Sequence, residues 1–238
     1  MLQLAGEVRR DKRLSAEQRF EVASLVEMHT RKDRKFPNKD AWWKEREESA
    51  RRLAAEFPGL PAPHEFLLQV AAWQRGTKRT DLAQEIVASG APAKIREAAA
   101  ALISRAALEG KTLASVLTNE PEGAGLLAAV GKRPLVLYTW RPDHEASIAK
   151  ARALAGTLPH SVEARGISLG HDLPAARGVA SERGLPGEQL DGGKDGDSPM
   201  LKRLSLTTPS LLYLVGKDGV IHDLSDETDV AAALAKFN

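Results

Sequence analysis

Apolar positions in the first part of the chain recur at helical spacing, in segments that turn residues interrupt. Ser15 begins the first segment, and Gln18 follows three residues later, which is a capping-box pattern and predicts a helix running to about Thr30. Further helices are predicted over 41–57, 64–74, 81–89 (capped by Thr80) and 92–109. The loops between them are short, which is typical of antiparallel helix hairpins.

After Gly110 the pattern changes to short apolar runs that predict strands. The predicted strands cover 112–117, 134–140, 161–169, 210–216 and 219–224, and the predicted helices cover 142–158, 173–183, 198–204 and 226–237, with a loop over 188–197. One βαβ crossover and a terminal ββα unit predict a mixed α/β sheet covered by helices on both faces. We therefore predict an all-helical domain over 1–109 and an α/β domain over 110–238.

Composition limits the partners and the compartment only weakly. Of the 238 residues, 42% are hydrophobic and 28% are charged, as in a globular protein that can bury a core. The formal net charge of +2 creates no field that points to nucleic acid or an anionic membrane, so we expect no nucleic-acid partner. No stretch is long and apolar enough to predict a membrane span. The start of the chain lacks the apolar core of a signal peptide, which leaves a cytoplasmic place and a removed leader both open.

The chain contains no cysteine. This excludes disulfides, thiolate nucleophiles, zinc sites with cysteine ligands and iron–sulfur clusters.

Four stretches of the second half, in the right order, resemble thioredoxin-like proteins of the TlpA/ResA type (AhpC/TSA-like), a branch of bacterial thiol–disulfide proteins. They are GKTLASVL…GAGLLAAVGK, GKRPLVLYTWRPDH, GLPGEQLDGGKDGDSPMLKRLSL and TTPSLLYLVGKDGVI. The resemblance implies a thioredoxin-like fold over 110–238 and an extracytoplasmic, periplasmic location. It also favours a cis peptide bond at Pro209. The helical first half resembles the helical extensions found on some such proteins.

The departure from the family is at its redox motif. By the resemblance, Arg141 stands at the nucleophilic cysteine and His144 at the resolving cysteine, so both positions are vestigial. Thiol–disulfide exchange needs a thiolate that attacks a sulfur atom, and neither side chain provides one. The family's activity is therefore chemically excluded, and no catalytic residue, cofactor or metal is predicted.

Two interpretations of the remaining site stay open. In the first, the site binds a protein or peptide, since pairing with an extended peptide needs no sulfur. The candidate residues are Trp140, Arg141, Pro142, Asp143, His144, Thr208 and Pro209. In the second, Trp140 only covers the end of the sheet and Arg141 is solvated at a helix start. The helical domain is an alternative place for partner binding.

A different class of function is the alternative to binding. The region of Arg141 and His144 could serve a non-thiol enzyme, a small anion or a metal, since a helix start favours anions. A weak metal site at Asp191, Asp195 and Asp197 is also conceivable, although a turn explains these carboxylates better. Three tryptophans of the helical half, at positions 42, 43 and 73, are expected to pack in the core or between the domains.

Overall fold

The structure is a computed structural model that describes residues 7–32, 34–170, 172–193, 196–227 and 229–236. Its contacts divide the chain into two compact units, Met1–Ile103 and Ser104–Asn238, which we call the helical unit and the sheet unit. The division falls inside one helix and precedes the predicted boundary after residue 109, which stays a prediction.

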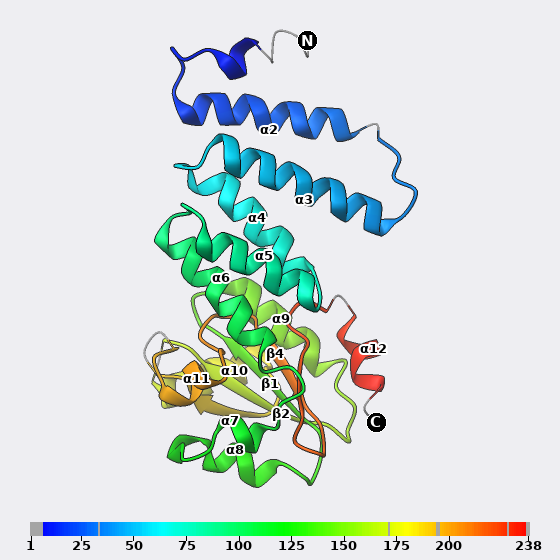
Figure 1. The fold of residues 1–238 in the computed structure, drawn as a ribbon. Helices are drawn as coiled ribbons and strands as arrows, with labels where there is room; N and C mark the ends of the chain where they lie inside the picture. The colour runs from blue at the N-terminus through cyan, green and yellow to red at the C-terminus, as the bar shows by residue number, and fades with distance from the viewer. Residues whose placement is uncertain (1–6, 33, 171, 194–195, 228, 237–238) are drawn as a thin grey trace. The chain divides into compact units, whose positions relative to one another are not determined.

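The helical unit consists of consecutive helices joined by short loops (Figure 1). They are α2 (Ala16–Lys32), α3 (Lys39–Glu56), α4 (Pro61–Trp73), α5 (Thr77–Ala88) and α6 (Ala93–Ala106). The predicted capping box is confirmed, because the Ser15 N–H donates to Gln18 Oε1 at 3.0 Å and the Gln18 N–H donates to Ser15 Oγ at 3.2 Å. The prediction that Thr80 caps a helix is wrong, because α5 begins at Thr77 and the Thr80 hydroxyl donates to the Thr77 carbonyl inside it.

The sheet unit contains five strands and the helices that cover them. In chain order its elements are α7 (Leu113–Val116), the 3₁₀ turn η1 (Pro121–Gly123), α8 (Ala124–Ala129), β1 (Leu135–Trp140), α9 (Glu145–Ala155), β2 (Glu163–Ser168), α10 (Leu173–Arg183), β3 (Glu188–Asp191), α11 (Pro199–Arg203), β4 (Leu212–Val215), β5 (Ile221–Asp223) and α12 (Val230–Ala235).

The strand order is β3-β2-β1-β4-β5, with β1 at the centre. β1, β2 and β3 are parallel, whereas β4 and β5 are antiparallel to their neighbours. The central βαβ crossover followed by a ββα unit is the arrangement of a thioredoxin-like fold, so the fold prediction is confirmed.

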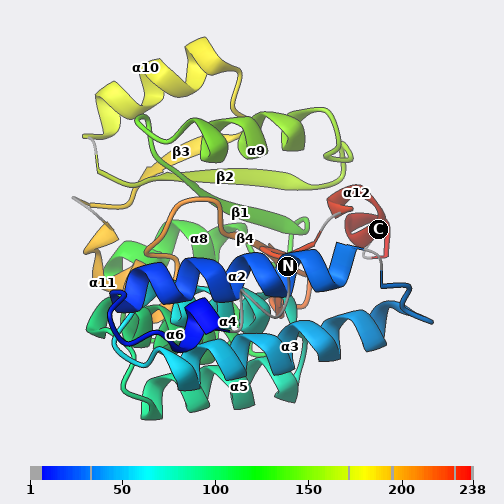
Figure 2. The same ribbon diagram turned by 90° about the horizontal axis from the view of Figure 1, so that it is seen from above.

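Both faces of the sheet are buried, as the continuous apolar run of β1 predicts. Leu135 and Leu137 face α7, α8 and α11, whereas Val136, Tyr138 and Trp140 face α9, α10 and α12. The two views of the ribbon show the sheet between these helices (Figures 1 and 2). Because successive side chains of a strand point to opposite faces, β1 contributes side chains to both hydrophobic cores.

The predicted strand over 112–117 is wrong, since this segment forms the short helix α7. Thr112 caps the helix, with its hydroxyl oxygen accepting from the Ser115 N–H at 3.3 Å. Leu113 and Leu117 are both buried in the same core. Residues four apart lie on one face of a helix and also on one face of a strand, so the spacing of the two leucines fits both structures. The Thr112 cap favours the helix.

The predicted loop over 188–197 begins instead with the edge strand β3, which pairs in parallel with β2. Only Leu190 of its four residues is apolar, so the apolar pattern predicted no strand. Its buried side chain is Gln189, which bonds to groups on β1. Polar contacts of Gln189 with β1 therefore help to hold β3 in the sheet, and the apolar pattern of the local sequence does not indicate such long-range contacts.

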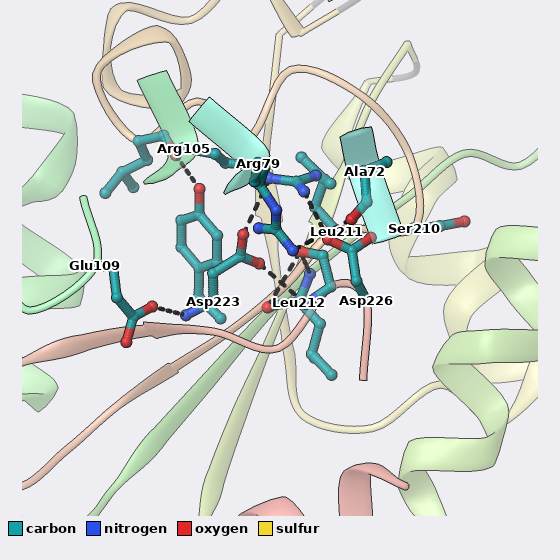
Figure 3. Close-up of polar contacts among 12 residues, drawn as sticks. Ala72, Arg79, Arg105, Glu109, Ser210, Leu211, Leu212, Asp223 and Asp226 are labelled. Carbon is teal, nitrogen blue, oxygen red and sulfur yellow. Dashed lines mark hydrogen bonds and ion pairs between the residues drawn. The ribbon is translucent and has the colours of Figure 1, made fainter. Parts of the chain in front are cut away.

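Within the sheet unit, an ion-pair cluster connects Arg105, in the last turn of α6, to β5 and the turn after it (Figure 3). Arg105 Nε lies 3.1 Å from an Asp223 oxygen, and Arg105 Nη2 lies 3.0 Å from an Asp226 oxygen. Glu109 accepts a hydrogen bond from the Asp223 backbone N–H at 2.7 Å. The Arg105 side chain is 9% exposed and that of Asp223 is 6% exposed, so water screens this pair little.

No helix among the described residues has the length and apolarity to cross a bilayer.

Candidate functional site

The loop that follows β1 carries the residues at the redox-motif positions. The His144 N–H donates to the Arg141 carbonyl at 3.1 Å, which closes a turn over Pro142 and Asp143. His144 is the N-cap of α9, where its Nδ1 accepts from the Ser147 N–H at 3.1 Å. A histidine at this place is thus explained by capping, since the side chain satisfies a backbone donor of the first helical turn.

Ser147 is the buried support of this turn, and the sequence analysis missed it. Its hydroxyl oxygen accepts from the Arg141 N–H at 3.1 Å, and the hydroxyl donates to the His144 carbonyl at 2.8 Å. Both bonds go to the backbone, so the hydroxyl is a structural group and not an activated nucleophile. A serine three residues after the cap residue is the only local signal that would have pointed to it.

Arg141 is bound to a neighbour in the same turn. Its Nε and Nη2 donate to the two carboxylate oxygens of Asp143 at 2.9 and 3.0 Å. The guanidinium lies beside Gly170, where an added β-carbon would be 3.8 Å from Arg141 Cζ. Asp143 therefore neutralises the positive charge of Arg141 within the turn at the start of α9.

The loop before β4 is anchored by the sheet. The Thr139 hydroxyl donates to the Thr208 carbonyl at 2.6 Å and its oxygen accepts from the Leu211 N–H at 2.9 Å. The Ser210 N–H donates to the Thr139 carbonyl at 2.9 Å. Ser210 has a φ of +71°, a left-handed conformation that is uncommon for serine and that these bonds hold in place.

The expected cis bond at Pro209 is wrong, because the described residues contain no cis peptide bond. The trans form is intrinsically favoured at X–Pro bonds by roughly 0.5–1 kcal/mol. The bonds of Thr139 to Thr208, Ser210 and Leu211 fix the loop in this form.

Strand pairing brings the two loops together. β1 and β4 are antiparallel, with Tyr138 opposite Leu212 as the last ladder pair. The hydrogen bonds between Thr139 and the segment 210–211 continue this pairing towards the loops. We give the name two-loop surface to six exposed or half-buried residues of the two loops, which are Arg141, Pro142, Asp143, His144, Thr208 and Pro209.

Trp140 does not belong to this surface, and the expectation that it anchors a partner is wrong. Its side chain is fully buried in the core under α9 and α10. The indole N–H donates to Gln189 Oε1 at 2.9 Å. The other interpretation of the sequence, in which Trp140 covers the end of the sheet, agrees with this position.

A small cavity lies beside the site. The cavity beside the site, lined in part by Ser147, Lys150 and Ser210, has a volume of about 10 Å³. This is about the space that one water molecule needs. A pocket for a small substrate is typically some 300–1,000 Å³, so this cavity gives no support to the enzyme alternative.

The conceivable metal site is not supported either. Among the residues that the structure describes, no three histidine or acidic side chains are grouped to hold a metal ion. Asp191 accepts from the Gly193 N–H at 2.8 Å, which is a turn contact. Asp195 lies outside the described residues. The turn interpretation of this segment therefore fits Asp191.

Lys150 connects the loop before β4 to the turn after β5. Its ammonium group donates to the carbonyls of Ser210 at 2.9 Å and Ser225 at 2.6 Å. Burial lowers the pKa of Lys150, and the charge of Asp226 opposes this shift. The side chain thus holds the loop before β4 from the side opposite to Thr139.

Replacing Lys150 with Met is expected to loosen this loop. A hydrogen bond from a charged group contributes about 1.5–3 kcal/mol, so amide exchange at Ser210 and Leu211 should accelerate roughly tenfold or more. Hydrogen exchange followed by mass spectrometry or NMR measures it. Lys217→Met, in the exposed hairpin turn at the other end of β4, is the matched control. Equal exchange rates in Lys150→Met and the wild type would contradict the anchoring role.

A buried polar network lies behind the site. Tyr138 donates to the Pro186 carbonyl at 2.7 Å and accepts from Gln189 Nε2 at 3.1 Å. Burial raises the pKa of Tyr138 to about 12, and the bond from Gln189 opposes the shift. Burial also raises the pKa of Tyr213, the second tyrosine of the chain.

These shifts predict how alkaline pH affects stability. Each folded-state pKa lies above the unfolded value of about 10, so above that pH the folded chain retains protons that the unfolded chain releases. The free energy of unfolding should therefore fall as the pH rises above about 10. Spectrophotometric titration should show no phenolate in the native chain near pH 10, and both tyrosines titrating near pH 10 in denaturant. A native tyrosine that titrates near pH 10 would contradict the buried network.

Known proteins show only remote similarity to the chain. No family model matches the chain, and no curated protein matches it. Among solved structures, a secreted disulfide oxidoreductase of Mycobacterium tuberculosis homologous to Escherichia coli DsbE is 19% identical over 46% of this chain and 85% of its own, with a TM-score of 0.37. The MTB protein dsbF, in its mixed oxidized and reduced forms, is 17% identical over 47% of this chain and 84% of its own, with a TM-score of 0.38.

A thioredoxin-like protein from Bacteroides caccae matches over a longer part of the chain. It is 15% identical over 94% of this chain and 95% of its own, with a TM-score of 0.39. These identities and scores are too low to carry an argument about function. The fold assignment therefore rests on strand order and register, and the TlpA/ResA-type branch stays a prediction.

Proposed function

We propose that this chain is a thioredoxin-like protein without thiol chemistry that binds an extended segment of another protein at the two-loop surface. The observation that supports the proposal is that hydrogen bonds hold both loops in place although the chain has no cysteine for redox chemistry at this site. Thr139 and Lys150 hold the loop before β4, and Ser147 holds the turn after β1. A preorganised loop pays less conformational entropy on binding.

The surface has the groups that peptide binding uses. Thr208 is exposed and is followed by the half-buried ring of Pro209, and the ring of Pro142, in the turn after β1, is also half-buried. Arg141 and Asp143 present a charged pair at the same place. An extended segment would meet backbone and side-chain groups here without any need for sulfur.

A non-thiol enzyme or a small-anion site is the second candidate, and the contacts favour it less. The start of α9 would attract an anion, but the Ser147 N–H already donates to His144 and the Arg141 guanidinium already pairs with Asp143. The proposal includes an extracytoplasmic place of action, which rests on the sequence resemblance alone.

Site-specific photocrosslinking tests the proposal in the native host. Benzoylphenylalanine at Thr208 should capture a partner, and the crosslinks should map to one extended segment. The same group at Lys217, exposed at the far end of β4, should not capture it. Adding Arg141→Ala to the Thr208 derivative should lower the yield roughly tenfold. Equal capture from both positions, or a yield that Arg141→Ala leaves unchanged, would refute binding at the two-loop surface.

A further inference from the structure

Four cationic side chains gather at one end of the sheet unit, around the turn that joins β4 to β5. All four are exposed, and in the part of the chain that the structure describes none of them forms a side-chain hydrogen bond or an ion pair. We call this group the basic end; its members are Lys111, Lys132, Arg133 and Lys217. The formal net charge of +2 for the whole chain does not reveal this local concentration of positive charge.

The backbone brings these residues together from three segments. β1 and β4 are antiparallel neighbours, so the residues just before β1 and just after β4 lie at the same end of the sheet. A β-carbon added to Gly219, in the turn after β4, would lie 3.1 Å from Val130 Cγ1, two residues before Lys132. The segment after α6 is bonded to the start of β5, because the Ile221 N–H donates to the Lys111 carbonyl at 2.8 Å. The three segments therefore meet at one hairpin turn (Figure 1).

The carboxylates near the basic end do not neutralise it. Asp218 is in the same turn as Lys217, and its Oδ1 accepts a hydrogen bond from the Val220 N–H at 3.0 Å. Two further carboxylates of this region interact with other side chains; they are Glu109 with His222 and Glu163 with Arg165. Four unpaired cations thus face the single carboxylate of the turn, and the basic end is positive.

The groups exposed near the basic end favour a charged surface as its partner. Interfaces with folded proteins have apolar or aromatic anchors at their centre, and single-stranded nucleic acids stack their bases on aromatic rings. Among the described residues, the exposed large apolar side chains all belong to the helical unit; they are Leu25, Met28, Trp73 and Val87. Trp73, which we expected to be packed, is 55% exposed. An anionic bilayer, in contrast, attracts unpaired cations without any apolar anchor.

We propose that the basic end binds the surface of a membrane that contains anionic phospholipids. The lysine and arginine side chains lie among the phosphate groups, and the attraction is electrostatic. β1 starts at the basic end and leads to the turn that carries Arg141, so a bound chain presents the two-loop surface at the end of the strand that is away from the bilayer. This inference goes beyond the function proposed for the two-loop surface and does not depend on it.

Co-sedimentation of the full chain with lipid vesicles tests the proposal. Vesicles of phosphatidylcholine mixed with phosphatidylglycerol should bind the chain at low salt, whereas vesicles of pure phosphatidylcholine should not. High salt should release the chain, because it screens exposed charges. Replacing any one residue of the basic end with Gln should lower the partition coefficient roughly fivefold, and replacing all four should abolish measurable binding.

A matched quadruple variant removes the same charge from other places. It replaces four exposed basic residues with Gln, at Lys78, Lys94, Arg96 and Lys202. Both quadruple variants change the net charge equally, but the matched variant should stay within about twofold of the wild type, because cations far from the bilayer are screened. Circular dichroism should show both variants folded, since all eight side chains are exposed. Arg141→Ala should leave vesicle binding unchanged, which separates the two sites.

Three results would overturn the proposal. The first is equal binding to vesicles with and without phosphatidylglycerol. The second is an equal loss of binding in the two quadruple variants, which would make the attraction a property of net charge. The third is tighter binding of a duplex DNA oligonucleotide or a glutamate-rich peptide at the same four residues, which would make the partner a nucleic acid or an acidic protein.

Discussion

Replacing Arg105 with Met is expected to lower the free energy of unfolding by about 3–5 kcal/mol. The guanidinium pairs with Asp223 and Asp226, and its side chain and that of Asp223 are almost fully buried. Burying a charge is costly without its counter-charge, so removing the Arg105 cation should destabilise the folded state, mainly through the buried carboxylate of Asp223. Urea unfolding followed by circular dichroism measures the change.

The control for Arg105 is an exposed pair in the same unit. Arg183 lies 3.3 Å from Glu145, and their side chains are 46% and 72% exposed. Surface pairs contribute about 0–1 kcal/mol, so Arg183→Met should have little effect. Adding Asp223→Asn to Arg105→Met should recover part of the loss, because it removes one of the buried charges. If Arg105→Met is as mild as Arg183→Met, the cluster does not stabilise the fold as described.

Trp140→Ala is the second substitution with a large expected effect. Trp140 is fully buried below the two-loop surface, and its truncation leaves a cavity and an unsatisfied Gln189, which should cost about 3–5 kcal/mol. Trp140→Phe keeps a ring and loses mainly the bond to Gln189, so about 1–3 kcal/mol is expected. Denaturant unfolding measures both.

Trp73→Ala is the matched control, because the same truncation at a side chain that is 55% exposed leaves no buried cavity. We expect it to change the free energy of unfolding by about 1 kcal/mol or less. Equal losses for Trp140→Ala and Trp73→Ala would contradict the burial of Trp140.

Much of the fold was predictable because its signals are local. The continuous apolar run of β1 predicted a strand buried on both faces, and the two cores confirm it. The helix predicted over 173–183 is α10, and Asp172 caps it, because its side chain accepts from the Ala175 N–H at 2.8 Å. Local chemistry determines such features, so sequence patterns are enough to find them.

The site was harder to predict because its contacts join distant parts of the chain. The burial of Trp140 depends in part on Gln189, which is 49 residues away, and the loop at Pro209 depends on Thr139 and Lys150. The resemblance implied the fold correctly but a cis Pro209 wrongly, and of the two interpretations of Trp140, the one in which it covers the end of the sheet agrees with the structure. Side-chain burial and loop geometry follow from these tertiary contacts, which periodicity does not encode.

The most direct test of binding at the two-loop surface uses the captured partner segment, made as a synthetic peptide. Its affinity is measured by titration against the full chain. We predict that Arg141→Ala with Thr208→Ala lowers this affinity roughly tenfold or more, whereas Trp73→Ala leaves it within about twofold of the wild type. An affinity that the double variant leaves unchanged would contradict binding at the two-loop surface. If Trp73→Ala then abolished binding, the helical unit would be the part of the chain that binds this partner.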